Sequence, residues 1–405
     1  MTRVPTEFRY WENLPKVARL RGVAKRVLGF DPAPPEHVAQ TFADMYYDAD
    51  PLAEAFVREV YFKEGSARGR ALLERALAEG VDAIDDVPAS LVRLFADIEQ
   101  DPEWMDPELV EHGARVFRRY GTAVFRFAGA ITLTAYAESS VAKPLALTGA
   151  YVGGSARNRF LETAAFWIAV SEPGGLAPKA PGRASALRVR VMHVFVREKL
   201  MSHPEWDVDA WGVPISQADA TLTLMGGSFA PGIALHAMGY RTSKADILAL
   251  MHFWRYVGHL MGVRPRFYPR DLKEAAQLSF LTFVKGARRA GEDEKRLCQA
   301  YAKAFEPNAG ASLRARLEHK VHLGYTRFFM PGKAYRKNQM PFAWPWALHP
   351  LMQAPMIFAA ETLRRRFPSL ERVADHVARR SRKRWLHQTM GKREAEYRPV
   401  ERFSR

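Results

Sequence analysis

The chain has 405 residues, of which 48% are hydrophobic and 26% charged, and it carries a net charge of +16. This balance is typical of a globular protein with a sizeable core and excludes an intrinsically disordered chain. The single cysteine, Cys298, excludes an intrachain disulfide and a CxxC metal pair, and it fits a reducing compartment.

The first residues contain no apolar stretch of the kind that forms an export signal, and no twin-arginine pattern. We therefore expect a cytoplasmic location. No run of 18 uncharged apolar residues occurs, so no membrane-spanning helix is predicted.

Residues 1–35 form an N-terminal extension that ends in Pro32-Ala-Pro34-Pro35, a sequence that a helix cannot cross. Helical periodicity dominates from residue 36 onward, and residues 36–361 are predicted to form a single large all-α domain. Early helices are expected at 65–78 and 87–97, with Ser90 as the N-cap of the second.

The middle of the chain is more apolar and consists of helix-like segments separated by glycine and proline. Few stretches alternate with a period of two, so little sheet is expected. Residues 188–196 alternate like a strand, but their flanks and length favour a helix. The predicted helices are 108–120, 121–138, 156–170, 185–202, 217–225, 232–238, 243–261, 271–287 and 292–305.

The C-terminal part changes character twice. Residues 326–350 are rich in proline and aromatic residues and predict an irregular covering layer. Residues 362–405 hold 14 lysines and arginines against five acidic residues. This basic helix or tail is compatible with solvent exposure or with peripheral contact with an anionic membrane. Net charge alone points to nucleic acid, and no reading helix or stacking motif supports such a partner.

Two histidine pairs occur at helical spacing. His319 and His322 share one helical face, but no third metal ligand stands near them in the sequence. His252 and His259 lie seven residues apart on an aromatic helix, where a hydrogen-bonded core role is favoured over metal ligation.

His193 lies in an apolar helix that carries arginines at fixed spacing. Arg190 precedes it by three residues and Arg197 follows it by four, so both lie on the histidine's side of the helix. A neutral imidazole in an apolar wall is suited to bind haem iron, and the two guanidinium groups are suited to bind the haem propionates. A buried structural histidine fits the same pattern, and the pattern alone leaves both interpretations open.

A second cluster consists of Arg159, Glu162 and Thr163, at positions i, i+3 and i+4 of an otherwise apolar helix. One interpretation is a surface ion pair within the helix. The other is a polar cluster directed at a pocket, in which a desolvated Glu162 exchanges protons and Arg159 compensates its charge.

Several stretches, taken together and in order, resemble the rubber oxygenase and latex-clearing protein family, which includes the mpaB-type oxygenases. The resemblance covers roughly residues 110–270. The matching stretches are Lys143-Pro-Leu-Ala-Leu-Thr148-Gly149, Arg159-Phe-Leu-Glu162-Thr163-Ala, Arg190-Val-Met-His193-Val-Phe-Val-Arg197, Trp206-Asp with Gly212-Val-Pro214-Ile-Ser-Gln217-Ala-Asp219, and Phe253-Trp254-Arg255-Tyr-Val-Gly258-His-Leu-Met-Gly262-Val263.

The resemblance implies a helical fold around haem b, with His193 as the proximal iron ligand and Arg159 and Thr163 on the distal side. Members of the family open isoprenoid double bonds with dioxygen. In latex-clearing proteins the residue before the distal threonine is a lysine, whereas this chain has Glu162. Glu138 is the nearest candidate for their separate upstream glutamate.

The sequence therefore predicts a haem b-dependent oxygenase that acts on a lipophilic unsaturated substrate, isoprenoid or lipid-like, with dioxygen or peroxide. Glu162 in place of lysine puts polymer cleavage in doubt, and extracellular rubber would not reach a cytoplasmic enzyme. Phe166, Trp167 and Phe195 are predicted to line the substrate channel. The alternatives are a haem protein without turnover and a haem-free helical protein that binds lipid or a membrane surface.

Overall fold

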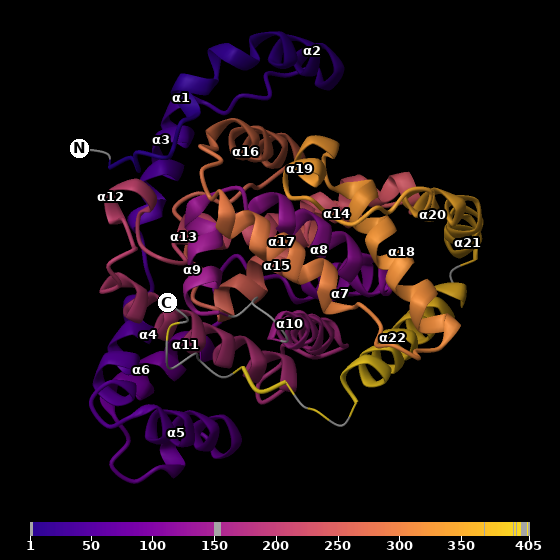
Figure 1. Cartoon of the computed structure of the whole chain (residues 1–405). Coiled ribbons are helices and arrows are strands. Elements are labelled where there is room, and N and C mark those ends of the chain that lie inside the picture. Colours follow the sequence, from indigo (N-terminus) through magenta and orange to yellow (C-terminus); the bar gives the residue numbers. More distant parts are fainter. Residues whose placement is uncertain are drawn as a thin grey trace.

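The computed structural model describes residues 3–149, 155–367, 369–391, 393, 395–397 and 403. Within these ranges the chain forms helices joined by turns and loops, and they contain no β-strand. The prediction of an all-α fold is confirmed. Figure 1 shows the helices gathered around a central group, with the N-terminal helices at its edges.

The N-terminal third contributes short helices and one π-helical turn, Val57–Tyr61. Phe8 and Tyr10 pack into the core although they belong to the predicted extension. Ser90 does not cap a helix: it lies inside α6, buried, and its hydroxyl has no partner in the described part of the chain. The helices are α1 (Tyr10–Asn13), α2 (Ala18–Leu28), α3 (Glu36–Asp44), α4 (Pro51–Phe56), α5 (Ser66–Glu79) and α6 (Ala89–Glu99).

Most of the central helices agree closely with the predicted ranges because their ends carry strong local signals. The helices at Ser139–Leu147 and Val208–Trp211 were not predicted, and the helix predicted at 232–238 begins at Phe229. Asp106 caps α7 by accepting hydrogen bonds from the Glu108 and Leu109 amides. Ser243 and Asp246 form a capping box at the start of α15. These helices are α7 (Pro107–Arg119), α8 (Ala123–Ala135), α9 (Ser139–Leu147), α10 (Ser155–Ser171), α11 (Pro181–Met201), α12 (Val208–Trp211), α13 (Gln217–Gly227), α14 (Phe229–Ala234), α15 (Lys244–Leu260), α16 (Leu272–Lys285) and α17 (Glu292–Ala304).

Helices α7 and α15 pack along their lengths and form the centre of the fold. Their backbones approach closely at Gly113, where a Cβ atom would come within 2.1 Å of the Ala249 carbonyl oxygen. Helices α10 and α11, which carry the two predicted functional clusters, pack against each other, and α10 also packs against α7. The fold therefore brings the two clusters to adjacent helices.

The C-terminal segments are more ordered than the sequence suggested. The predicted irregular layer at 326–350 contains the end of a long helix and two shorter ones as well as loops, and the basic segment forms α22. Trp385 of α22 stacks on Phe125 with ring centroids 5.2 Å apart, and Arg382 is fully buried. These helices are α18 (Leu313–Phe329), α19 (Gly332–Lys337), α20 (His349–Met352), α21 (Ala354–Arg366) and α22 (Ser369–Met390).

A frayed tail is thus a wrong description of residues 369–390, which form a helix, whereas many of their side chains are exposed, as expected. Within the described residues, no helix combines the length and the apolar character needed to cross a bilayer.

Candidate functional site

His193 lies near the middle of α11, between the buried residues Met192 and Val194. Its imidazole is partly exposed and makes no hydrogen bond to the residues that the structure describes. Burial, followed by the positive charges of Arg197 and Arg159, lowers the pKa of His193 to about 3. The ring is therefore neutral near pH 7, with its nitrogen lone pair available, which is the state that binds a metal.

Arg190 is fully buried and pairs with two carboxylates. Its Nε and Nη2 atoms donate to Asp50 at 2.7 and 2.9 Å, and Nη1 donates to Asp97 at 2.7 Å. Asp50 also caps α4, and Asp97 lies on α6. Every guanidinium nitrogen is engaged, so Arg190 ties α11 to the N-terminal helices and is not free to bind a propionate.

Arg197 is engaged in the same way on the other side of His193. Its Nε and Nη2 atoms donate to the carbonyl oxygens of Pro214 and Ile215, at 2.9 and 2.6 Å. Its Nη1 atom donates to Glu54 at 3.4 Å. The prediction that Arg190 and Arg197 bind haem propionates is therefore not supported by their contacts. Instead, the two arginines hold α11 against its neighbours one turn before and one turn after His193.

Arg159 and Glu162 of α10 form an ion pair, with Nη1 3.6 Å from Oε2. Both side chains are partly exposed. The Nη2 atom of Arg159 lies 3.9 Å from the sulfur of Met192, the residue before His193, and its charge lowers the pKa of His193. The structure thus brings this pair next to the predicted iron ligand.

Thr163 lies one turn after Arg159 on the same helix. Its hydroxyl donates to the Arg159 carbonyl oxygen at 3.0 Å, within the helix, and its side chain lines an apolar pocket of about 430 Å³. The pocket lies between α8, α10 and α17 and has aromatic walls. Other lining residues include Phe125, Leu133, Phe160, Trp167 and Tyr301.

Of the three aromatic residues predicted to line a channel, Trp167 lines this pocket. Phe195 instead packs against Tyr61 and Phe62, with ring centroids 5.8 and 5.4 Å apart. Phe166 is buried in the core and is not among the residues that line this pocket. The sequence could not separate these roles, because a core phenylalanine and a pocket phenylalanine follow the same helical spacing.

Tyr397 is a neighbour that the sequence gave no reason to expect. It is buried beside α11 and lines a small pocket with Arg188 and Met192. Burial raises the pKa of Tyr397 to about 12, and the nearby Glu162 carboxylate adds to the rise. The C-terminal segment therefore reaches the α10 and α11 helices that carry the predicted site.

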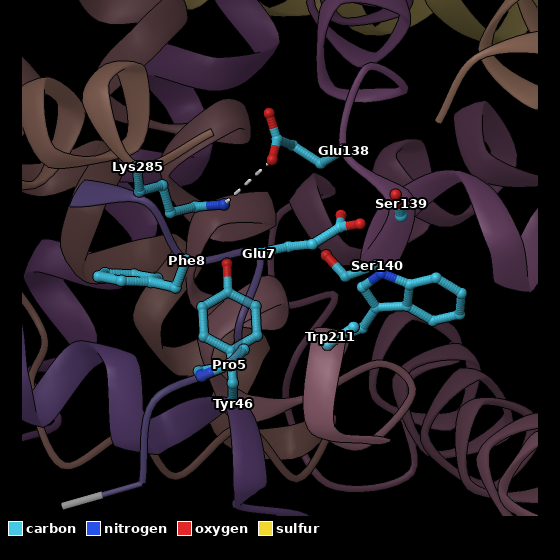
Figure 2. A pocket seen from close by; sticks show the side chains of 10 residues that line it. Pro5, Glu7, Phe8, Tyr46, Glu138, Ser139, Ser140, Trp211 and Lys285 are labelled. Atoms are coloured by element: carbon cyan, nitrogen blue, oxygen red, sulfur yellow. Dashed lines mark ion pairs between the residues drawn. The ribbon is translucent and has the colours of Figure 1, made fainter. Parts of the chain in front are cut away.

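Glu138 lies elsewhere, in a polar pocket of about 260 Å³ (Figure 2). Its Oε2 atom is 4.0 Å from Nζ of Lys285, and Glu7 of the N-terminal segment also faces the pocket. Tyr46 and Trp211 each bring a buried donor to it that has no hydrogen-bond partner in the described residues. The ion pair with Lys285 and the residues of this pocket do not support a role for Glu138 as the distal glutamate beside His193.

Members of the two remaining histidine pairs contact neighbouring residues, although His319 Nδ1 and His322 Nε2 are buried and have no hydrogen-bond partner among the described residues. His252 accepts a hydrogen bond from the Asp106 amide at 3.0 Å, which confirms its core role. The buried ring of His322 packs on Tyr301 and Phe305, at 4.8 and 4.5 Å. The described residues contain no group of three or more His, Cys, Asp or Glu side chains that could hold a metal ion.

Burial lowers the pKa of His322 to about 3, whereas the pKa of an unfolded histidine is about 6.5. Between these values the unfolded chain takes up a proton that the folded chain does not, so we expect the free energy of unfolding to fall as the pH drops from about 6.5 toward 3. His322→Leu should make this slope shallower in urea unfolding measured at several pH values. His37→Leu, at an exposed histidine, is the control, and an unchanged slope in the first variant would contradict the prediction.

The sequence of this chain was compared with models of known protein families. Residues 114–391 match the catalytic domain described as ER-bound oxygenase mpaB/B'/Rubber oxygenase. The matched range extends well beyond the predicted 110–270 and includes α22.

A curated rubber oxygenase from Streptomyces sp. strain K30 is 25% identical over 188 residues, which is 45% of this chain and 45% of that protein. The alignment thus spans less than half of that relative's length. The solved structure of latex clearing protein LCP in the closed state superposes with a TM-score of 0.63 and 17% identity, over 84% of this chain and 91% of that one. This likeness shows a shared fold.

Proposed function

The chain belongs to the family of mpaB-type and rubber oxygenases, and on this basis we propose that it is a haem b-dependent oxygenase of a lipophilic, unsaturated substrate. One observation carries the proposal. A neutral histidine without a hydrogen-bond partner lies beside an acid–base pair on the neighbouring helix, and that helix also lines an apolar pocket.

The residues present fit a haem. His193 presents a neutral imidazole that no described residue engages, which is the property required of an axial ligand. We assign His193 as the residue that holds the iron. When bound, the haem would supply the iron on which dioxygen or peroxide is activated.

Glu162 is proposed to move a proton at its carboxylate during the reaction. General acid–base groups of this kind work when they are partly desolvated and kept in place. The ion pair with Arg159 keeps the Glu162 carboxylate oriented, and the Met192 contact in turn places Arg159 against α11. The ordinary pKa of a glutamate lies well below that of a lysine, so near pH 7 Glu162 is suited to begin as a proton acceptor.

The apolar pocket is proposed to bind the hydrocarbon part of the substrate. Thr163 and Trp167 of α10, the helix that carries the ion pair, are among the residues that line it. Its aromatic walls exclude water and favour an alkene or a short isoprenoid chain.

Glu162→Gln should lower turnover about 10²–10⁴-fold while the haem remains bound, because the amide keeps the shape of the side chain but cannot exchange the proton. Turnover of lipophilic alkenes would be followed by product analysis, with dioxygen and with peroxide in separate reactions. Glu99→Gln, at an exposed position on α6, is the control. Unchanged turnover in Glu162→Gln would remove its catalytic role.

The two alternatives predict different results for the purified protein supplied with hemin. A haem protein without turnover gives a strong Soret band that shifts on reduction, but no product from any alkene. A haem-free lipid binder stays colourless and retains no hemin. A Soret band together with an oxygenated product would support the proposed function.

A further inference from the structure

Helices α20, α21 and α22 carry a set of apolar side chains that the rest of the fold leaves uncovered. Met352, the last residue of α20, and Met356 of α21 are 76% and 70% exposed, and Leu363 of α21 is exposed as well. These three residues are the methionine and leucine stripe of this surface. Soluble proteins rarely expose contiguous apolar side chains of this size without a partner. In Figure 1 these helices form one edge of the molecule, at the right of the view.

The exposed face of α22 continues this surface and then changes character along the helix. Val373 and Val377 are exposed on its first turns. One turn further on, at the same helical spacing, the exposed residues are Arg380 and Arg384. The second half of α22 lines a wide, open groove with cationic and imidazole side chains, which are His376, Arg379, Arg380, Lys383, Arg384 and His387.

The positive charge of this surface is only partly neutralised by the fold, because Arg379 and Lys383 both pair with Glu172, at 2.8 and 2.6 Å. The three acidic residues of α21 and α22 all pair with arginines of the fold: Glu361 and Glu371 with Arg364, and Asp375 with the buried Arg118. Arg372, Arg380 and Arg384 are exposed and have no carboxylate partner among the described residues. These three arginines are therefore available to contact an anionic partner.

We propose that this surface, made of α20, α21 and α22, binds the face of an anionic phospholipid bilayer. The methionine and leucine stripe enters the boundary between headgroups and acyl chains, and the arginines of α22 contact the lipid phosphates. The charge selects an anionic bilayer over a second copy of this chain, because two copies would bring their cationic grooves together. This inference does not depend on the chemistry of the His193 site.

The test is co-sedimentation of the full chain with vesicles of phosphatidylcholine, with and without phosphatidylglycerol. We expect binding only to the anionic vesicles, and binding that weakens with salt, since the Debye length falls from about 10 Å at 0.1 M to about 3 Å at 1 M. Arg380→Gln with Arg384→Gln should weaken binding about five-fold for each cation removed. Met352→Glu with Met356→Glu should abolish it.

Two matched controls lie outside this surface. Phe283→Glu changes an exposed apolar residue of α16, and Arg93→Gln changes an exposed cation of α6. Both should leave vesicle binding unchanged, and thermal unfolding should show that all variants fold. Equal binding to neutral vesicles, no binding at all, or equal loss in the controls would overturn the proposal. A second copy of the chain would be the partner instead if light scattering showed a concentration-dependent dimer, if the two methionine changes abolished that dimer, and if the protein did not bind vesicles. That result would also overturn the proposal.

Discussion

His193→Ala should purify without haem and should not acquire the Soret band when hemin is added. The imidazole of His193 is neutral, partly open and unengaged by the described residues, so it is the group on α11 that can supply a nitrogen to iron. Alanine removes that nitrogen and leaves the flanking ion pairs of Arg190 and Arg197 intact. The measurement is the visible spectrum, as isolated and after reduction.

His252→Ala provides the matched control, because His252 is a partly buried histidine with a backbone partner. It should keep the Soret band. Imidazole added to the His193→Ala protein should restore part of the haem binding, since the free base can occupy the space of the missing side chain. Full haem retention in His193→Ala would reject His193 as the iron ligand, because the haem would then be held by another residue.

Arg190→Ala should lower the free energy of unfolding by about 3–5 kcal/mol, the range found when one partner of a buried ion pair is removed. The guanidinium is 1% exposed and makes three charge-assisted hydrogen bonds. Its loss leaves the buried Asp50 without a cation, whereas Asp97 keeps the partner Arg264. Chemical unfolding of the haem-free protein measures the effect.

Arg188→Ala is the control on the same helix. Arg188 pairs with Glu74 near the surface, and such a pair contributes about 0–1 kcal/mol. Adding Asp50→Asn to Arg190→Ala should recover part of the lost stability, because the uncompensated charge is then removed. If the double variant is no more stable than Arg190→Ala, the unpaired Asp50 charge is not the cause of the destabilisation.

The helical organisation could be predicted from the sequence because its signals are local. The ranges predicted for α5, α10, α15 and α17 agree with the structure to within a few residues. Apolar spacing, caps and glycine or proline breaks all act within one or two turns. Ser90 shows the limit of this reasoning: a serine near a helix start predicts a cap, but here the helix begins one residue earlier.

The site could be predicted only in part. The i, i+3, i+4 spacing of α10 placed Arg159 and Glu162 together, and the structure contains their ion pair. The partners of Arg190 and Arg197 could not be predicted, because Asp50 lies 140 residues from Arg190, and Glu54 lies 143 residues from Arg197. An arginine near a predicted ligand looks the same in sequence whether it binds a propionate or a distant carboxylate.

The sequence by itself determined which segments are helical, which faces are apolar and which residues can carry acid–base or ligand chemistry, since each of these depends on neighbours within a few positions. Only the tertiary structure decided which of those residues meet. It directed Arg190 to Asp50, placed Glu138 beside Lys285, buried Arg382 of the basic segment and left Met356 uncovered. The physical reason is that burial and pairing are properties of contacts between helices, and those contacts join residues far apart in the chain.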